Sequence, residues 1–167
     1  MLSRCITPIC SLSKTGLLLV SIALSAPLTA PALADSGPSQ VLYIFPGVYD
    51  NGDAQFTGIA TAVHCFSFSP TPETIQYTAR NFNAALVTTT TYTIGKFETA
   101  TAVTHPVSLY GSEVVLNTGP LTQGVIGIAA TSANIVCTAH VIDASATVPN
   151  GIDLHGTRFN PISGSQE

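Results

Sequence analysis

Four histidines are the residues best suited to chemistry near neutral pH, because an imidazole can serve there as an acid, a base or a metal ligand. They are His64, His105, His140 and His155. His64 and His140 each lie near a cysteine, at an odd spacing that puts histidine and cysteine on opposite faces of a strand. If the cysteines point into the core and bridge two sheets, these two histidines lie on opposite outer faces. We therefore expect surface histidines that share no metal ion.

Carboxylates and one serine are the other candidates for chemistry. The Asp-Asn-Gly-Asp sequence at 50–53 lacks the residue order and the distal glutamate of a calcium loop, and its Asn-Gly pair predicts a tight turn. Asp143 and Asp153 flank a Pro-Asn-Gly loop, where two carboxylates could hydrolyse a glycoside at a suitable separation. Nothing in the sequence sets that separation, so we expect a solvated loop. Ser163 lacks the G-x-S-x-G context of a hydrolase nucleophile. We assign no catalytic, cofactor-binding or metal-binding residue.

Residues 1–34 have the features of a signal peptide. A stretch with two cations precedes an apolar run at 16–24, and the Ala-Leu-Ala sequence that ends at Ala34 suits signal peptidase. The apolar run is shorter than the about 20 residues that span a bilayer. We expect cleavage before Asp35, which leaves 35–167 as a single domain in the periplasm or outside the cell.

Two cysteines remain after the leader, Cys65 and Cys137. Thiols oxidise in an exported protein, and an even count favours one intramolecular disulfide. The bridge closes a loop of about 72 residues, which in the chain-entropy model contributes on the order of 4 kcal/mol. A zinc site is the alternative, but two isolated cysteines without a C-x-x-C pair make a poor zinc signature.

The charge of the exported part limits its partners. Leader removal takes away two of the five Lys and Arg residues and none of the nine Asp and Glu residues, so the formal charge of 35–167 is −6. Three scattered cations cannot form the basic surface that nucleic acid or anionic lipid requires. We expect neither nucleic acid nor, after cleavage, a membrane as partner. A protein or a carbohydrate is left.

Short runs of β-prone residues, separated by turn residues, predict an all-β chain. The clearest strand is 74–80, where Ile75, Tyr77 and Ala79 alternate with polar residues and should face inward. The other predicted strands span 40–45 (ended by Pro46-Gly47), 56–69, 85–94, 99–105, 113–117, 124–131, 134–143 and 154–159. The threonines within these runs are favoured strand residues, although a flat array of hydroxyls could also bind carbohydrate or ice.

About eight strands without an amphipathic helical window indicate a Greek-key β-sandwich. The cysteines fall in an early and a late strand, as in an immunoglobulin-like sandwich bridged between its sheets. The chain has no tryptophan to pack on such a bridge, and Ile135 stands where a tyrosine corner would have tyrosine. The pattern therefore favours an Ig-like sandwich over a true immunoglobulin domain.

Four segments carry a resemblance: Ala62-Val63-His64-Cys65, Ala79-Arg80-Asn81-Phe82, Ile135-Val136-Cys137-Thr138-Ala139 and the tail from Leu154 to Pro161. In these the chain resembles a group of small exported bacterial proteins with no assigned activity. The resemblance covers most of residues 35–167. It implies export and an Ig-like β-sandwich, and it brings no catalytic or ligand-binding residue.

Three functional hypotheses remain. The leader, the single disulfide and the missing catalytic motifs favour a non-enzymatic module that binds or builds through its surface. A fimbrial or coat-type assembly subunit shares the leader, the size, the low charge and the single disulfide, but the chain lacks an aromatic residue near its end and its cysteines are unusually far apart. A secreted hydrolase that uses Asp and His on loops is the third.

Overall fold

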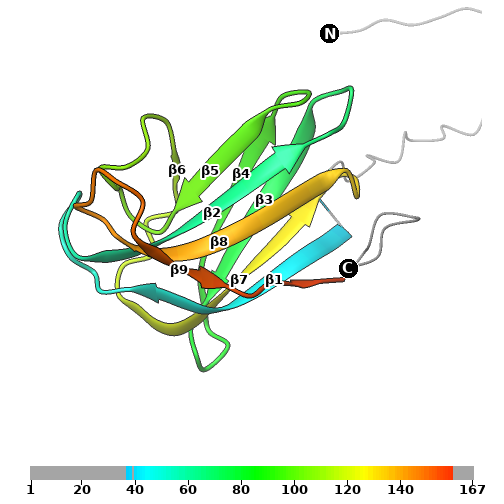
Figure 1. The fold of residues 1–167 in the computed structure, drawn as a ribbon. Coiled ribbons are helices and arrows are strands. Elements are labelled where there is room, and N and C mark those ends of the chain that lie inside the picture. Colours follow the sequence, from blue (N-terminus) through cyan, green and yellow to red (C-terminus); the bar gives the residue numbers. More distant parts are fainter. Residues whose placement is uncertain (1–36, 39, 160–167) are drawn as a thin grey trace, which may run out of the picture. The chain divides into compact units, whose positions relative to one another are not determined.

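The structure, a computed structural model, describes residues 37–38 and 40–159. These residues form two five-stranded sheets that pack as a β-sandwich (Figure 1). The predicted all-β sandwich with one disulfide is thereby confirmed. The signal-peptide prediction, with its cleavage site between Ala34 and Asp35, and Ser163 lie outside the described residues. The described residues contain no helix with the length and hydrophobicity that crossing a bilayer requires.

The first sheet, called the β1 sheet, has the order β10-β1-β7-β3-β4. Its strands are β1 (Gln40–Asp50), β3 (Glu73–Arg80), β4 (Leu86–Ile94), β7 (Leu121–Ala130) and β10 (Thr157–Arg158). The second sheet, called the β2 sheet, has the order β6-β5-β2-β8-β9. Its strands are β2 (Ile59–Ser67), β5 (Thr99–Val103), β6 (Val114–Val115), β8 (Ile135–Asp143) and β9 (Gly151–Leu154). Neighbouring strands are antiparallel except β5 and β6, which are parallel.

The core lies between the inner faces of the two sheets. On β3 the predicted inward residues Ile75, Tyr77 and Ala79 are fully buried, as alternation requires. Each large apolar side chain buried in this way contributes roughly 1.5–3 kcal/mol. The hydroxyl of Tyr77 has no hydrogen-bond partner among the described residues, and burial, followed by the neighbouring Tyr92, raises the pKa of this phenol.

Strand β1 continues through Pro46 and Gly47, where the sequence predicts an end. Strand β10 pairs only with Tyr43 and Ile44, so the far half of β1 has a strand neighbour on one side only. A proline is tolerated in a strand at such a free side or at a bulge. The register with β7 shifts between Pro46 and Val48, and Gly47 has a φ of 82°. The bulge therefore allows the strand to pass through a Pro-Gly pair.

The strand predicted at 154–159 is two strands in different sheets. Strand β9 pairs with β8, whereas β10 pairs with β1 in the opposite layer. The chain crosses between the layers at Gly156, where a Cβ atom would clash with the ring of Phe45. The continuous run of β-prone residues therefore gives no sign of the crossover between the sheets, which requires glycine at position 156.

A smaller hydrophobic cluster lies outside the main core, on the outer face of the β2 sheet. The segment 104–116, between β5 and the turn after β6, folds over this face. Val107 is buried there together with Ile142 of β8, and Leu109 and Tyr110 pack against the cluster. The other buried members are Ala60, Ala62, Val103 and Ala144. This segment brings Tyr110 onto a face that strand alternation alone would leave open.

Candidate functional site

The disulfide joins two neighbouring strands of one sheet. Cys65 on β2 lies directly opposite Cys137 on β8, with 4.1 Å between the Cα atoms. The prediction of the bond is confirmed, and both side chains face the core. Its predicted position between two sheets is wrong, because β2 and β8 are adjacent although 72 residues separate the cysteines.

This arrangement places His64 and His140 side by side on the same outer face. His140 lies opposite Ala62, and His64 lies opposite Thr138, so the two histidines are diagonal neighbours across the strand pair. Their ring centroids are 5.3 Å apart. The expectation that the two histidines occupy opposite faces is therefore wrong. It failed because it rested on a disulfide between sheets.

Both histidines have polar partners. Nδ1 of His64 is 2.9 Å from the hydroxyl of Thr101, and Nε2 is 3.0 Å from the phenol oxygen of Tyr110. The Tyr110 ring also packs edge-on against the imidazole, with centroids 4.9 Å apart. Nδ1 of His140 is 2.6 Å from a carboxylate oxygen of Asp153 on β9. We call these five side chains the histidine patch.

Burial shifts the pKa of two side chains of the patch. Burial, followed by the neighbouring His140, lowers the pKa of His64 from its ordinary value of 6.5. Burial, followed by the Glu113 carboxylate, raises the pKa of Tyr110. At neutral pH the patch therefore presents a neutral imidazole at His64 and a phenol hydroxyl at Tyr110. Each of these groups can both donate and accept a hydrogen bond.

A pocket of about 330 Å³ opens beside the patch. Its walls combine the polar groups of Tyr110, His140 and Asp153 with apolar side chains and the loop before β9. The remaining lining residues are Leu109, Ile142, Pro149, Asn150 and Gly151. No lysine or arginine lines it. This mixture of apolar walls and a few placed polar groups is typical of a small-molecule site.

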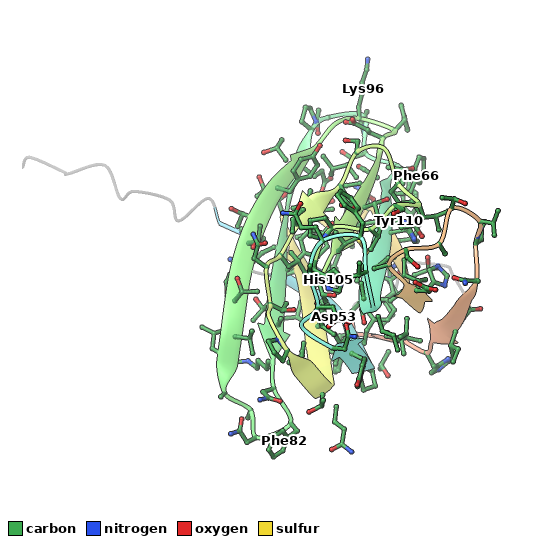
Figure 2. The ribbon with its side chains drawn as sticks, turned by 90° about the vertical axis from the view of Figure 1, so that its left-hand side faces the viewer. Asp53, Phe66, Phe82, Lys96, His105 and Tyr110 are labelled. Carbon is green, nitrogen blue, oxygen red and sulfur yellow. A yellow bond between two sulfur atoms is a disulfide. The ribbon has the colours of Figure 1, made fainter. Side chains whose placement is uncertain are left out.

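The segment that carries His105 and Tyr110, both labelled in Figure 2, is anchored by a buried carboxylate, that of Asp50. Oδ2 of Asp50 is 2.8 Å from Nδ1 of His105, near the start of the segment. The same oxygen accepts a hydrogen bond from the hydroxyl of Thr118, just beyond β6, at 3.3 Å. The other carboxylate oxygen accepts the N–H of Gly52 at 2.7 Å. Asp50 therefore ties the end of β1 to both ends of this segment.

His105 is the site residue that the sequence did not distinguish from the other histidines. It is only 8% exposed. Its Nε2 is 3.1 Å from the carbonyl oxygen of Thr57, while Nδ1 faces the Asp50 carboxylate. A carbonyl and a carboxylate both accept hydrogen bonds, so each ring nitrogen of His105 faces an acceptor. The role of His105 is to hold the fold of the site.

The remaining residues that the sequence suggested for chemistry, Asp143, Asp153 and His155, have separate surroundings. Asp143 binds the backbone N–H and the hydroxyl of Ser145, and these hydrogen bonds, the hydroxyl first, lower the pKa of its carboxyl group. Asp153 instead pairs with His140, so the two carboxylates have different hydrogen-bond partners. His155 is exposed and lies outside the pocket lining.

The chain leaves β1 at the predicted Asn-Gly position, where Gly52 has a φ of 74° and its N–H donates to Oδ1 of Asp50, but the turn is not that of a hairpin. The connection from β1 to β2 spans 51–58 and crosses between the two sheets, so no hairpin joins these strands. Asp53 accepts a hydrogen bond from the side chain of Asn51 at 2.6 Å. Within the described residues, no group of three or more His, Cys, Asp and Glu side chains has an arrangement that could hold a metal ion.

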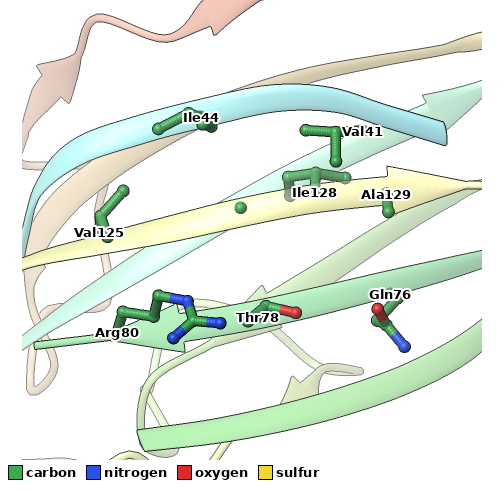
Figure 3. A pocket seen from close by; sticks show the side chains of 9 residues that line it. Val41, Ile44, Gln76, Thr78, Arg80, Val125, Ile128 and Ala129 are labelled. Atoms are coloured by element: carbon green, nitrogen blue, oxygen red, sulfur yellow. The ribbon is translucent and has the colours of Figure 1, made fainter. Parts of the chain in front are cut away.

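A second hollow, of about 260 Å³, lies on the outer face of the β1 sheet (Figure 3). Three polar side chains of β3, Gln76, Thr78 and Arg80, border a mostly aliphatic floor over β1 and β7. The guanidinium of Arg80 donates to the carbonyl oxygen of Ala84 at 3.0 Å. The polar groups here are spaced along one strand. In the histidine patch they hold one another in place, so we take the patch as the candidate site.

Comparisons of the chain with protein-family models, with curated proteins and with solved structures found no match.

The lowered pKa of His64 predicts that the protein loses stability as the pH falls below neutrality. Above pH 6.5 the histidine is neutral in both the folded and the unfolded chain. Below this value the unfolded chain takes up the proton first, so the free energy of unfolding decreases until the pH passes the folded pKa. Urea unfolding of the wild type and of His64→Gln, from about pH 7.5 to about pH 5, measures this difference. An identical pH dependence in the two proteins would contradict the prediction.

Proposed function

We propose that the protein is an exported, non-enzymatic β-sandwich that binds a neutral carbohydrate at the histidine patch. The observation that carries the proposal is the convergence of five hydrogen-bonded side chains from β2, β5, β8, β9 and the segment 104–116 beside one pocket. Groups that hold one another in place are arranged before a ligand arrives, which lowers the entropic cost of binding.

The chemistry of the patch fits a sugar. Sugar hydroxyls donate and accept hydrogen bonds, and so does the phenol hydroxyl of Tyr110, which lines the pocket. The Asp153 carboxylate adds an acceptor that is 89% exposed. The aromatic ring of Tyr110 and the apolar pocket wall suit the C–H face of a sugar ring. Because no lysine or arginine lines the pocket, a neutral ligand fits better than an anionic one.

Composition supports the cellular setting that we propose. The signal-peptide features at 1–34 and the resemblance to small exported bacterial proteins of Ig-like fold both favour the periplasm or the cell exterior. The charge of −6 over 35–167 disfavours nucleic acid and anionic membrane as partners. A hydrolase remains the alternative at the same site, since the Asp153 carboxylate could orient His140 as a general base.

Isothermal titration with neutral trisaccharides tests the proposal. We name maltotriose, cellotriose, xylotriose and chitotriose as the panel, because they differ in linkage and substituents and carry no charge. The expected result is that at least one sugar binds and that His140→Ala weakens its binding at least about tenfold, the equivalent of one lost hydrogen bond of about 1.4 kcal/mol. Recovery of the intact sugar after the titration separates a binding module from a hydrolase.

His155→Ala is the matched control, because it removes an exposed histidine that lies outside the pocket lining. It should bind the sugar as the wild type does. The proposal fails if no sugar of the panel binds, or if the two alanine variants weaken binding equally.

A further inference from the structure

Strand β4 forms one edge of the β1 sheet and is its longest exposed edge. Eight of the nine residues of β4, Leu86–Ile94, pair with β3 on one side, and no other described strand pairs with the opposite side. One row of backbone N–H and C=O groups is therefore left without a strand partner in the described part of the chain. The other three edge strands, β6, β9 and β10, have only two to four residues.

Most of the devices that usually protect a sheet edge are missing from β4. It contains no charged residue and no proline, and seven of its nine residues are β-branched. The only irregularity in its pairing is a register shift at the start of β4, opposite Ala79 and Arg80 of β3. A long, uncharged, β-branched edge is a template for pairing with another strand.

The sequence of β4 points to a second copy of this chain as the partner. The strand has a threonine run at its centre, 88–91, and no charged side chain along its length. In an antiparallel pair of identical strands with a two-fold axis at Thr90, Thr89 meets Thr91 and Thr90 meets Thr90 of the second copy. Such cross-strand pairs are favourable, and no like charges are brought together.

The two-fold axis also fixes which residues meet. Thr89 and Thr91 lie opposite Thr78 and Gln76 of β3, so they share the outer face of the sheet. Around the axis at Thr90, each Thr89 faces the Thr91 of the second copy. We propose that two copies of the chain pair through β4 in this register, which joins two five-stranded sheets into one of ten strands. This inference does not depend on the carbohydrate site.

Sedimentation velocity of the oxidised protein over a range of concentrations tests the pairing. The expected result is a reversible dimer. Thr89→Lys/Thr91→Lys places two pairs of like charges across the interface and should raise the dimer dissociation constant at least about tenfold. Thr89→Lys/Thr91→Glu places opposite charges in the same two pairs and should restore dimerisation. Far-ultraviolet circular dichroism checks that each variant is folded.

Gln76→Lys/Thr78→Lys is the matched control, since it adds the same charge on the same face but one strand away from the edge. It should dimerise as the wild type does. A wild-type monomer at all concentrations overturns the proposal, and so does a dimer that tolerates Thr89→Lys/Thr91→Lys. A dimer that the Lys/Glu variant fails to restore contradicts the register about Thr90.

Discussion

Replacing Asp50 by alanine should destabilise the protein by about 3–5 kcal/mol, the range measured when one partner of a buried ion pair is removed. Asp50 is fully buried, and its carboxylate receives hydrogen bonds from His105, Thr118 and Gly52. The variant leaves these donors without their acceptor in a place that water does not reach. Urea unfolding at pH 7 measures the change.

Asp53→Ala is the control for this prediction. Asp53 belongs to the same loop but is exposed, so its replacement should change the free energy of unfolding by no more than about 0.5 kcal/mol. Asp50→Ala should also weaken sugar binding, because the segment that carries Tyr110 loses its anchor at both ends. Equal stability of Asp50→Ala and Asp53→Ala would show that the buried carboxylate does not hold the segment.

Removing the disulfide should cost about 2–5 kcal/mol of stability. The bond closes a loop of 72 residues, so Cys65→Ala/Cys137→Ala gives the unfolded chain much more freedom. The variant should still fold, because β2 and β8 remain paired over nine residue positions and the alanine side chains fit the core that the cysteines fill. Urea unfolding of the variant and of the wild type measures the loss.

The wild type in a strong reductant provides the matched comparison for the double alanine variant. The two proteins should unfold at similar urea concentrations, since both lack the covalent link but differ by only two sulfur atoms. A loss of less than about 1 kcal/mol would show that the bond contributes little to stability.

The fold could be predicted from the sequence where the signal is local. Alternation along β3 gave the correct inward face, and turn residues separated most strands correctly. The cysteines face the core, the condition on which the outward orientation of His64 and His140 depended. Local patterns fail where a bulge or a crossover intervenes, as at Gly47 in β1 and at Gly156 between β9 and β10.

The site could not be predicted because it depends on which strands are neighbours. The alternation of side chains along β2 and β8 correctly predicts that His64 and His140 face outward. This alternation carries no information about the sheet to which each strand belongs. The pairing of Cys65 with Cys137 was predicted, yet a disulfide is compatible with strands in one sheet or in two. Tyr110 lies in a segment that is tied to β1 by the buried contact between Asp50 and His105, 55 residues apart.

The most direct test of carbohydrate binding is a spectrum of the histidine ring nitrogens during a titration with the four neutral trisaccharides. Because weak sugar binding is expected, the titration extends to roughly 10 mM ligand. The account predicts that the signals of His64 and His140 shift together, with one dissociation constant, while those of His105 and His155 stay in place. If none of the sugars moves the signals of His64 and His140, the histidine patch does not bind these carbohydrates.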